Sequence, residues 1–423
     1  MNGAATPNDA CAGLVLLARN PTDSVTEGFL PAAARLGLAV TLLTDQPDAH
    51  RQAYERHADG RRAGGPPAGA PLEIVPCDVP DAREVIARIS ARGTRSGPPA
   101  AVFTNSDHLQ VQAALAADYF GLPGKDWRAA FRTKNKAELR RSLAAAGLDT
   151  VTSAELAPDD DPAGHGVPYP CVVKPREGVA SEDVFLVADD AELAARCREI
   201  RAGRPGAALV VEEYLDGALH TLETLGDGHT LHPLAAFRTD VSPPPHFVEE
   251  RLCLLPAPPQ PCTDQVLAQL RALGVGFGAC HTEYVDQGGR ARLIEVNYRA
   301  IGDRCDLALA EALDLPLFEL ILRTHLGEPL PDRLGARRGV RVRMEYVCAD
   351  RAGVLKAAPE AHVREAGGVL LDYRPLRETG ERHPLYGTNR DFLGVLRATG
   401  RDEGRIDAAV REFLAAHCWE IVP

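Results

Sequence analysis

Residues 278–303 read GACHTEYVDQGGRARLIEVNYRAIGD, two apolar runs separated by a Gly-Gly pair. This pattern predicts an antiparallel hairpin that turns at Gly288 and Gly289. Successive strand side chains point to opposite faces, so alternate residues of the second strand share a face. One face is expected to carry Leu293, Glu295, Asn297 and Arg299, and the other Ile294 and Val296.

Two carboxylates converge in this hairpin, because the turn places Glu283 opposite residue 294 or 295. Like charges about 5 Å apart repel by about 1 kcal/mol or more when partly shielded, so either a proton or a divalent cation should compensate them. Asn297 and Arg299 favour the cation, since oxygen ligands suit Mg²⁺ and a guanidinium beside it suits phosphate. The alternative is that both glutamates lie on a solvated sheet face.

A phosphate site needs positive charge, and the chain contains no GxxxxGK[ST] phosphate loop. Lys174 ends the apolar run YPCVVK, and Pro175 fixes the chain as it leaves the strand. The following loop, REGVASED at 176–183, contains the small residues Gly178 and Ser181, so its backbone could close over phosphate oxygens. An ordinary strand-end lysine is an equally good interpretation of Lys174 alone.

A second strand exit, LVVEEYLDG at 209–217, could hold an adenine ring. Its backbone and Glu212 would face the edge of the ring, and Leu215 would pack against its face.

The N-terminal region alternates strand-like runs with helical ones and predicts an open parallel α/β layer. Ligands on such layers bind at the carboxyl ends of strands, where the loops ARNPTDS and TNSDH lie. Their polar residues, Asn20, Asp23, Asn105 and Asp107, either contact a substrate or simply cap helices and turns.

After residue 125 the pattern changes. TKNKAELRRSLAAAG at 133–147 predicts a helix with Thr133 as N-cap and Gly147 after its end. Several strands then follow without intervening helices, which favours antiparallel pairing. Residues 306–327 are expected to form a helix, and the last ninety or so residues a separate small α+β lobe.

Composition excludes several classes of function. The net charge of −12 opposes a nucleic-acid partner, which usually needs a basic face. The sequence has no apolar run of membrane-spanning length and no basic signal-peptide start, so no membrane partner is expected and the cytoplasm is the default location. The ten cysteines are scattered singly, as expected for reduced thiols in the core.

The order of these motifs resembles the ATP-grasp superfamily, and in particular carboxylate–amine ligases such as L-amino acid ligases and siderophore-pathway ligases. The resemblance covers roughly residues 126–330 and is most specific in the hairpin. It implies the α/β and α+β ATP-grasp fold, with an N-terminal Rossmann-like α/β domain and a small C-terminal α+β lobe. The implied domains are 1–125 (N-terminal), 126–208 (small subdomain), 209–330 (large subdomain) and 331–423 (C-terminal lobe).

The resemblance also implies roles for individual residues. Lys136 and Lys174 match the two lysines that hold nucleotide phosphates, with Lys134 as a competitor for the first role. Arg299 and Lys174 are the catalytic candidates: Arg299 matches the arginine that faces the transferred phosphate, and the positive charge of Lys174 suits the dispersal of charge during transfer. The expected magnesium ligands are Glu283, Glu295 and Asn297. The expected nucleotide-binding residues are Lys136, Lys174, Gly178, Ser181, Glu212, Glu213, Leu215 and Glu223. The loop departs from the glycine-rich family pattern at Ala180, Glu182 and Asp183.

The implied cofactors are ATP and Mg²⁺, with Mn²⁺ as the alternative metal. The implied partners are a small-molecule carboxylate and an amine, with a homodimer as the oligomeric option. Phosphoryl transfer from ATP would activate the carboxylate as an acyl phosphate, which the amine attacks. The alternatives are carboxylation or phosphotransfer on the same fold, and a non-catalytic nucleotide-binding regulator. His281 is not expected to act as a catalytic base, since a packed or hydrogen-bonded histidine is the favoured interpretation.

Overall fold

The N-terminal part is a four-stranded parallel sheet with strand order β3-β2-β1-β4, as the sequence predicted. We describe the protein from a computed structural model that covers residues 13–60, 72–148, 151–335 and 339–423. The strands are β1 (Gly13–Leu17), β2 (Ala39–Thr44), β3 (Leu72–Pro76) and β4 (Ala101–Phe103). Helical segments follow them: η1 (Ser24–Phe29), α1 (Leu30–Arg35), α2 (Pro47–Gly60), α3 (Ala82–Ser96), η2 (Asp107–Leu109) and α4 (Gln110–Tyr119).

Two helices connect this layer to the rest of the chain, α5 (Trp127–Lys134) and α6 (Lys136–Ala145). The sequence predicted one helix with Thr133 as its N-cap, and that prediction is wrong. Asn135 separates the two helices in a non-helical conformation, and its side chain accepts a hydrogen bond from the Glu138 backbone N–H. The predicted end of α6 is confirmed, because Gly147 has a φ of +67°.

A second four-stranded sheet has the order β5-β8-β6-β7. All its neighbouring strands are antiparallel, which confirms the expected pairing. Its elements are β5 (Ser153–Leu156), β6 (Cys171–Pro175), β7 (Phe185–Val187), β8 (Leu209–Glu213) and the covering helix α7 (Asp190–Gly203). The predicted subdomain boundary between residues 208 and 209 is therefore misplaced, because β8 pairs with β5 and β6.

The third sheet has nine strands in the order β13-β12-β9-β10-β11-β14-β19-β17-β16. Its first half comprises β9 (Ala218–Asp227), β10 (Leu231–Val241), β11 (Glu249–Leu254), β12 (Phe277–Asp286) and β13 (Ala291–Asn297). Its second half comprises β14 (Arg341–Cys348), β16 (His362–Ala366), β17 (Val369–Pro375) and β19 (Phe392–Gly400). The accompanying helices are α8 (Cys262–Leu273), α9 (Cys305–Ala312), α10 (Leu317–His325) and α11 (Glu403–Ala416).

The C-terminal region is thus not the separate lobe that the sequence suggested. β14 pairs with β11, where Leu252 lies opposite Met344, and so extends the sheet of the preceding region. Pairing at a sheet edge satisfies the backbone groups of both strands, and sequence periodicity cannot reveal it. A small separate sheet accompanies the nine-stranded sheet in this region. It consists of β15 (Gly353–Ala357), β18 (Arg382–His383) and β20 (Glu420–Val422), and the short turn η3 (Asn389–Asp391) precedes β19.

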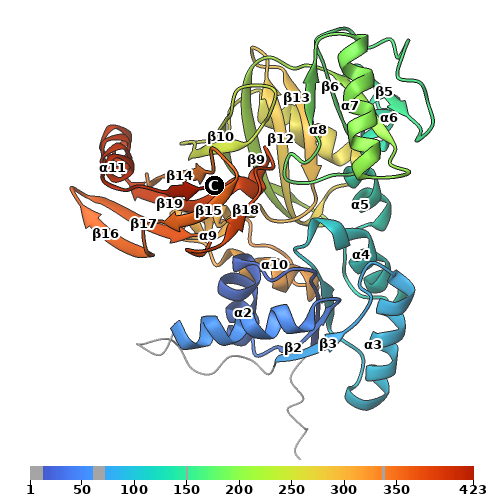
Figure 1. The fold of residues 1–423 in the computed structure, drawn as a ribbon. Helices are drawn as coiled ribbons and strands as arrows, with labels where there is room; N and C mark the ends of the chain where they lie inside the picture. The colour runs from blue at the N-terminus through green and yellow to red at the C-terminus, as the bar shows by residue number, and fades with distance from the viewer. Residues whose placement is uncertain (1–12, 61–71, 149–150, 336–338) are drawn as a thin grey trace, which may run out of the picture.

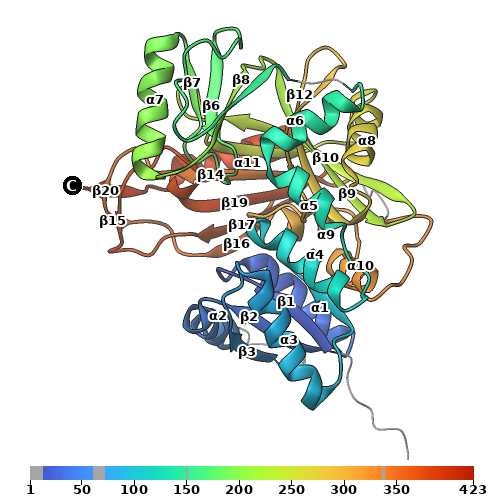
Figure 2. The ribbon, with the colours of Figure 1, turned by 90° about the vertical axis from the view of Figure 1, so that its right-hand side faces the viewer.

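The N-terminal layer, the nine-stranded sheet and the β5–β8 sheet lie in succession (Figures 1 and 2). The predicted helix at 306–327 is in fact the pair α9 and α10, which pack between the N-terminal layer and the C-terminal strands. Phe29 meets Phe318 edge-on there, with ring centroids 5.0 Å apart. In the described ranges the cysteines are free thiols, most of them buried. Within those ranges, no helix combines the length and apolar character needed to cross a bilayer.

Candidate active site

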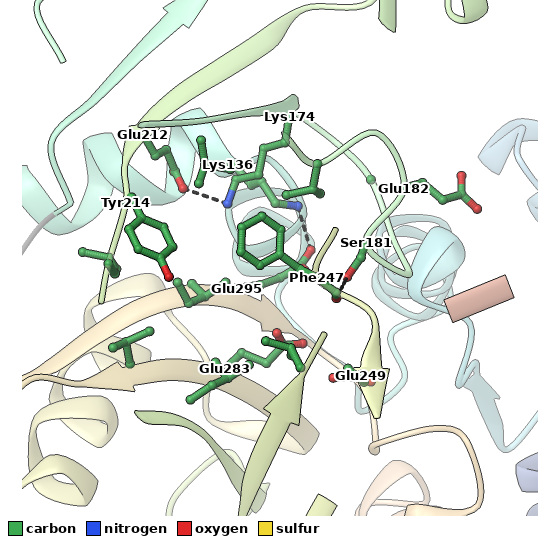
Figure 3. A pocket seen from close by; sticks show the side chains of 18 of the residues that line it. Lys136, Lys174, Ser181, Glu182, Glu212, Tyr214, Phe247, Glu249, Glu283 and Glu295 are labelled. Carbon is green, nitrogen blue, oxygen red and sulfur yellow. Dashed lines mark hydrogen bonds and ion pairs between the residues drawn. The ribbon is translucent and has the colours of Figure 1, made fainter. Parts of the chain in front are cut away.

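A cavity lies between the β5–β8 sheet and the hairpin β12–β13 (Figure 3). Its apolar part is lined by Val172, Leu215, Leu219, Val285 and Ile294. Its charged part is lined by Lys136, Lys174, Glu212, Glu283 and Glu295. A flat apolar ring with a polyanionic tail would fit this division of the cavity.

The predicted hairpin register is confirmed, because Glu283 lies opposite Glu295 and His281 opposite Asn297. The alternation within β13 differs from the prediction, however. A β-bulge leaves Ile294 without a partner, since Tyr284 pairs with Leu293 and Glu283 with Glu295. Ile294 and Glu295 therefore both line the cavity, whereas Leu293 packs in the core with Val296.

The two opposed carboxylates have cationic neighbours. Lys136 Nζ lies 2.7 Å from Glu295 Oε1, and His281 Nε2 lies 3.4 Å from Glu283 Oε1. Asn297 Nδ2 donates to Glu283 Oε1 over 3.4 Å. Burial opposes a charge on Lys136, but Glu295 outweighs it and raises the lysine pKa. The convergence predicted for Glu283, Glu295 and Asn297 is therefore present.

Their donor set fits an oxygen-preferring divalent cation. The carboxylates of Glu283 and Glu295 and the amide oxygen of Asn297, from neighbouring strands, can converge on one ion. Lys136 already places a positive charge beside Glu295. No group of three or more His, Cys, Asp or Glu side chains arranged for a metal occurs in the part of the chain that the structure describes.

Lys174 points into the cavity from the end of β6, but it is paired with a carboxylate there. Its Nζ lies 2.8 Å from Glu212 Oε2, and Arg140 contacts the same carboxylate at 2.7 and 3.1 Å. Burial disfavours the Glu212 charge, but Arg140 and Lys174 hold the pKa of that carboxyl well below its usual range. The Glu212 side chain thus orients two cations, which differs from its expected place at an adenine edge.

The other expected nucleotide residues divide into two groups. Gly178, Ser181, Glu213 and Leu215 line the cavity. Glu223 is buried in β9, does not line the cavity, and accepts a 2.8 Å hydrogen bond from His281 Nδ1.

Lys134 does not line the cavity, because it pairs with Asp107 and donates to the Gly178 carbonyl over 3.2 Å. Of the two competing lysines, Lys136 is the one that lines the cavity.

His281 lies between two carboxylates, with Nδ1 2.8 Å from Glu223 and Nε2 3.4 Å from Glu283. Burial alone would lower its pKa, but Glu223 and Glu283 raise it to about 10. Both ring nitrogens are thus engaged by carboxylates, and the side chain orients Glu223 and Glu283.

A second cavity continues from the first and is lined by Glu283, Glu295, Asn297 and Arg299. The Arg299 guanidinium donates to the Ala300 carbonyl at 2.9 Å and lies 3.9 Å from Asp107. Burial opposes the Asp107 charge, but Lys134 and Arg299 lower the pKa of that carboxyl.

A third cavity adjoins the second at Arg299 and Asp303 and reaches the N-terminal layer. The loops after β1 and β4 line it with Asn20, Asp23, Asn105 and Asp107, the residues for which the sequence left two interpretations open. Asn105 Oδ1 accepts from the Ala300 backbone N–H at 3.1 Å, and Asp23 pairs with Arg304. These side chains therefore tie the N-terminal layer to the segment after β13.

Sequence reasoning missed Glu249, which opens β11 and lines both the first and second cavities. Burial and the neighbouring Glu283 raise the pKa of Glu249 to about 8. Its partner Asn389 comes from the C-terminal region. The local sequence VEERL carries no motif, so only the spatial neighbourhood identifies this residue.

Comparison with known proteins agrees with this geometry. Residues 167–307 match the ATP-grasp domain family. An uncharacterised protein of Sinorhizobium fredii, y4rH, is 26% identical over 366 residues, which cover 83% of this chain and 74% of that protein. A D-alanine–D-alanine ligase of Cereibacter sphaeroides is 37% identical over 99 residues, only 22% of this chain and 29% of the ligase.

The fold similarity extends over nearly the whole chain. The crystal structure of an L-amino acid ligase from Bacillus licheniformis superposes with a TM-score of 0.76 at 20% identity, covering 98% of this chain and 100% of the ligase. Residues 167–307 of this chain thus match the ATP-grasp domain family, and the chain as a whole has the fold of the L-amino acid ligase.

Proposed function

We propose that the protein is an ATP-dependent carboxylate–amine ligase that forms an amide bond through an acyl phosphate and releases ADP and phosphate. The observation that carries this proposal is the continuity of the three cavities through shared residues. Glu283 and Glu295 line the first and second cavities, and Arg299 lines the second and third. A phosphoryl group at the Glu283–Glu295 pair would thus meet a substrate that enters beside the N-terminal layer.

The first cavity is the proposed nucleotide site. Its apolar walls would hold the adenine, with Leu215 and Ile294 on the faces of the ring. Lys136 and Lys174 would turn from their carboxylate partners toward the phosphates. Both lysines are only 7% exposed in their side chains, so their charges act on phosphate with little solvent screening.

Glu283, Glu295 and Asn297 would hold the metal, with Mg²⁺ the first choice and Mn²⁺ the alternative. When bound, the metal would offset phosphate charge during transfer. Arg299 faces the same place from the end of β13 and would stabilise the negative charge that develops on the transferred group.

The third cavity is the proposed site of the carboxylate. A carboxylate oxygen would attack the γ-phosphorus of ATP, form the acyl phosphate and release ADP. The amine would then attack the acyl carbon, form the C–N bond, lose a proton and release phosphate. We infer that the substrates are amino acids or small natural-product carboxylates, because polar and charged side chains surround a cavity large enough for molecules of that size.

The test has two stages. A screen for ADP release with Mg²⁺ across amino acids and hydroxy acids, with mass spectrometry of the products, would identify an active pair. The same reaction would then be run with ¹⁸O in the carboxylate. One labelled oxygen should appear in the released phosphate, since the C–O bond breaks when the amine attacks. An amide product together with unlabelled phosphate would refute the acyl-phosphate route.

A further inference from the structure

The lid loop, residues 176–184, forms one wall of the proposed nucleotide site. Gly178, Val179 and Ser181 of this loop line the first cavity. Three of its non-glycine residues have left-handed backbone conformations, with φ of 56° at Ala180, 57° at Ser181 and 57° at Asp183. Such conformations are unfavourable for residues with a Cβ, so contacts from outside the loop must hold its shape.

Part of that support comes from Phe247 and from the end of α7. Ser181 Oγ donates to the Phe247 carbonyl over 2.9 Å. The Arg204 guanidinium, at the end of α7, bonds Glu182 at 2.7 Å and also bonds Asp183. These contacts fix the loop to the end of α7 and to the segment that precedes Glu249.

Further support comes from the C-terminal region, about 200 residues further along the sequence. We call residues 388–391 the latch turn. The Asn389 backbone N–H donates to the Ala180 carbonyl over 3.4 Å, and the Arg390 guanidinium pairs with Glu182. The loop is therefore held on the side that faces the second cavity.

Asn389 also binds Glu249, the carboxylate that lines both cavities. Its Oδ1 accepts from the Glu249 backbone N–H at 3.0 Å, and its Nδ2 donates to Glu249 Oε2 at 3.1 Å. One amide side chain thus fixes the position of β11 and of the Glu249 carboxylate, while its own backbone contacts the lid loop.

The latch turn is itself rigid. Asp391 is 2% exposed and accepts from the backbone N–H groups of Tyr386 at 2.9 Å and Gly387 at 2.6 Å. His383 Nε2 lies 2.9 Å from the same carboxylate, and Thr388 completes a capping box with Asp391. A turn held in this way can present Asn389 and Arg390 at fixed positions.

We propose that the latch turn holds the lid loop over bound nucleotide, with Asn389 and Arg390 as positioning residues for nucleotide retention. The inference rests on the proposed nucleotide site. Nucleotide can enter or leave past this wall only when the lid loop moves, and that movement breaks the contacts to Asn389 and Arg390. The C-terminal region therefore controls the rate at which nucleotide is exchanged.

The test measures release of a fluorescent ADP analogue from the full-length protein in the presence of Mg²⁺. Arg390→Ala should speed release about five- to tenfold, the change expected for losing one ordinary hydrogen-bonded pair. Asn389→Ala keeps the backbone bond to Ala180 but loses the side-chain bonds to Glu249 that position the turn, so it should speed release by a smaller factor. Arg351→Ala is the matched control, because its exposed guanidinium bonds the neighbouring Asp350 in the same region. Its release rate should equal that of the unmodified protein.

A double-mutant cycle adds a readout that general destabilisation would not produce. Glu182→Gln and Arg390→Ala should each speed release, and the double variant should be no faster than the faster single variant, because both remove the same contact. Release rates equal to that of the unmodified protein would overturn the latch. Lower melting temperatures without faster release would also overturn it, by assigning the turn a structural role alone. Absence of nucleotide binding in the unmodified protein would instead refute the proposed function on which the latch depends.

Discussion

Lys136 Nζ lies 2.7 Å from Glu295 Oε1, so the lysine proposed for phosphate and the carboxylate proposed for metal are bonded to each other. Their side chains are only 7% and 19% exposed, respectively. The ammonium and the carboxylate neutralise each other within the site. When ligands bind, Lys136 would contact phosphate and Glu295 would contact the metal, in place of the contact between the two side chains. A substitution at either residue should therefore affect the stability of the fold as well as activity.

Glu295→Gln should nearly abolish ADP release, since it removes a charged oxygen proposed for the metal. It should also lower the free energy of unfolding by about 3 kcal/mol or somewhat less, because Lys136 loses its carboxylate partner in a largely buried place. Urea denaturation and an ADP-release assay measure the two effects.

Asn297→Ala separates activity from stability at the same site. The amide makes one long contact, 3.4 Å to Glu283, so its loss should cost little stability while ADP release falls at least about 100-fold. Unchanged turnover in this variant would refute the metal assignment.

Lys174→Met should weaken ATP binding and catalysis together, because one ammonium would contact phosphate in both the ground state and the transition state. The fold should tolerate the change, because Arg140 remains bonded to both oxygens of Glu212. Lys356→Met is the control, since this lysine is exposed and pairs with Glu420 at 3.0 Å. A normal KM for ATP in Lys174→Met would show that Lys174 serves only to pair with Glu212.

Arg299→Ala should slow phosphate release with only a modest change in ATP affinity. A cation that acts mainly on charge developing during transfer affects kcat more than ground-state binding. We expect kcat to fall by about 100-fold or more, by analogy with the loss of other groups that stabilise transition-state charge. Steady-state kinetics with an active substrate pair would distinguish this result from an equal rise in KM for ATP, which would assign Arg299 to binding.

Lys125 should make stability depend on pH. Burial lowers its pKa from 10.5 to about 7, and its Nζ contacts Gln110 Oε1 at 2.7 Å and the Tyr298 carbonyl. Below about pH 7 the folded and unfolded chains both hold the proton; between about pH 7 and 10.5 only the unfolded chain does. The contribution of Lys125 to stability therefore rises with pH in that window, by at most about 1.4 kcal/mol per pH unit.

Urea denaturation of the unmodified protein and of Lys125→Met, at several pH values, measures this effect. The stability difference between the two should shift in favour of the unmodified protein as pH rises through the window. A difference that stays constant with pH would mean that the folded protein retains a lysine of ordinary pKa at this position.

The sequence by itself determined the features that depend on neighbours along the chain. The hairpin followed from the Gly288–Gly289 turn, which placed Glu283 opposite residue 294 or 295; in the structure it lies opposite Glu295. The parallel N-terminal layer and the antiparallel β5–β8 sheet followed from the spacing of apolar runs and helices. These signals are local because turn geometry and side-chain alternation are set by a few consecutive residues.

Only the tertiary structure decided contacts between distant segments. The bulge at Ile294 moved Leu293 to the core, although the sequence predicted regular alternation. Glu212 proved to be the partner of Lys174 and Arg140, and β14 joined the edge at β11. Glu249 acquired its place from Asn389, 140 residues away. Such contacts form because a buried charge needs an opposite charge and a strand edge needs a partner strand. The partner can come from any distant segment, so the periodicity of the sequence does not identify it.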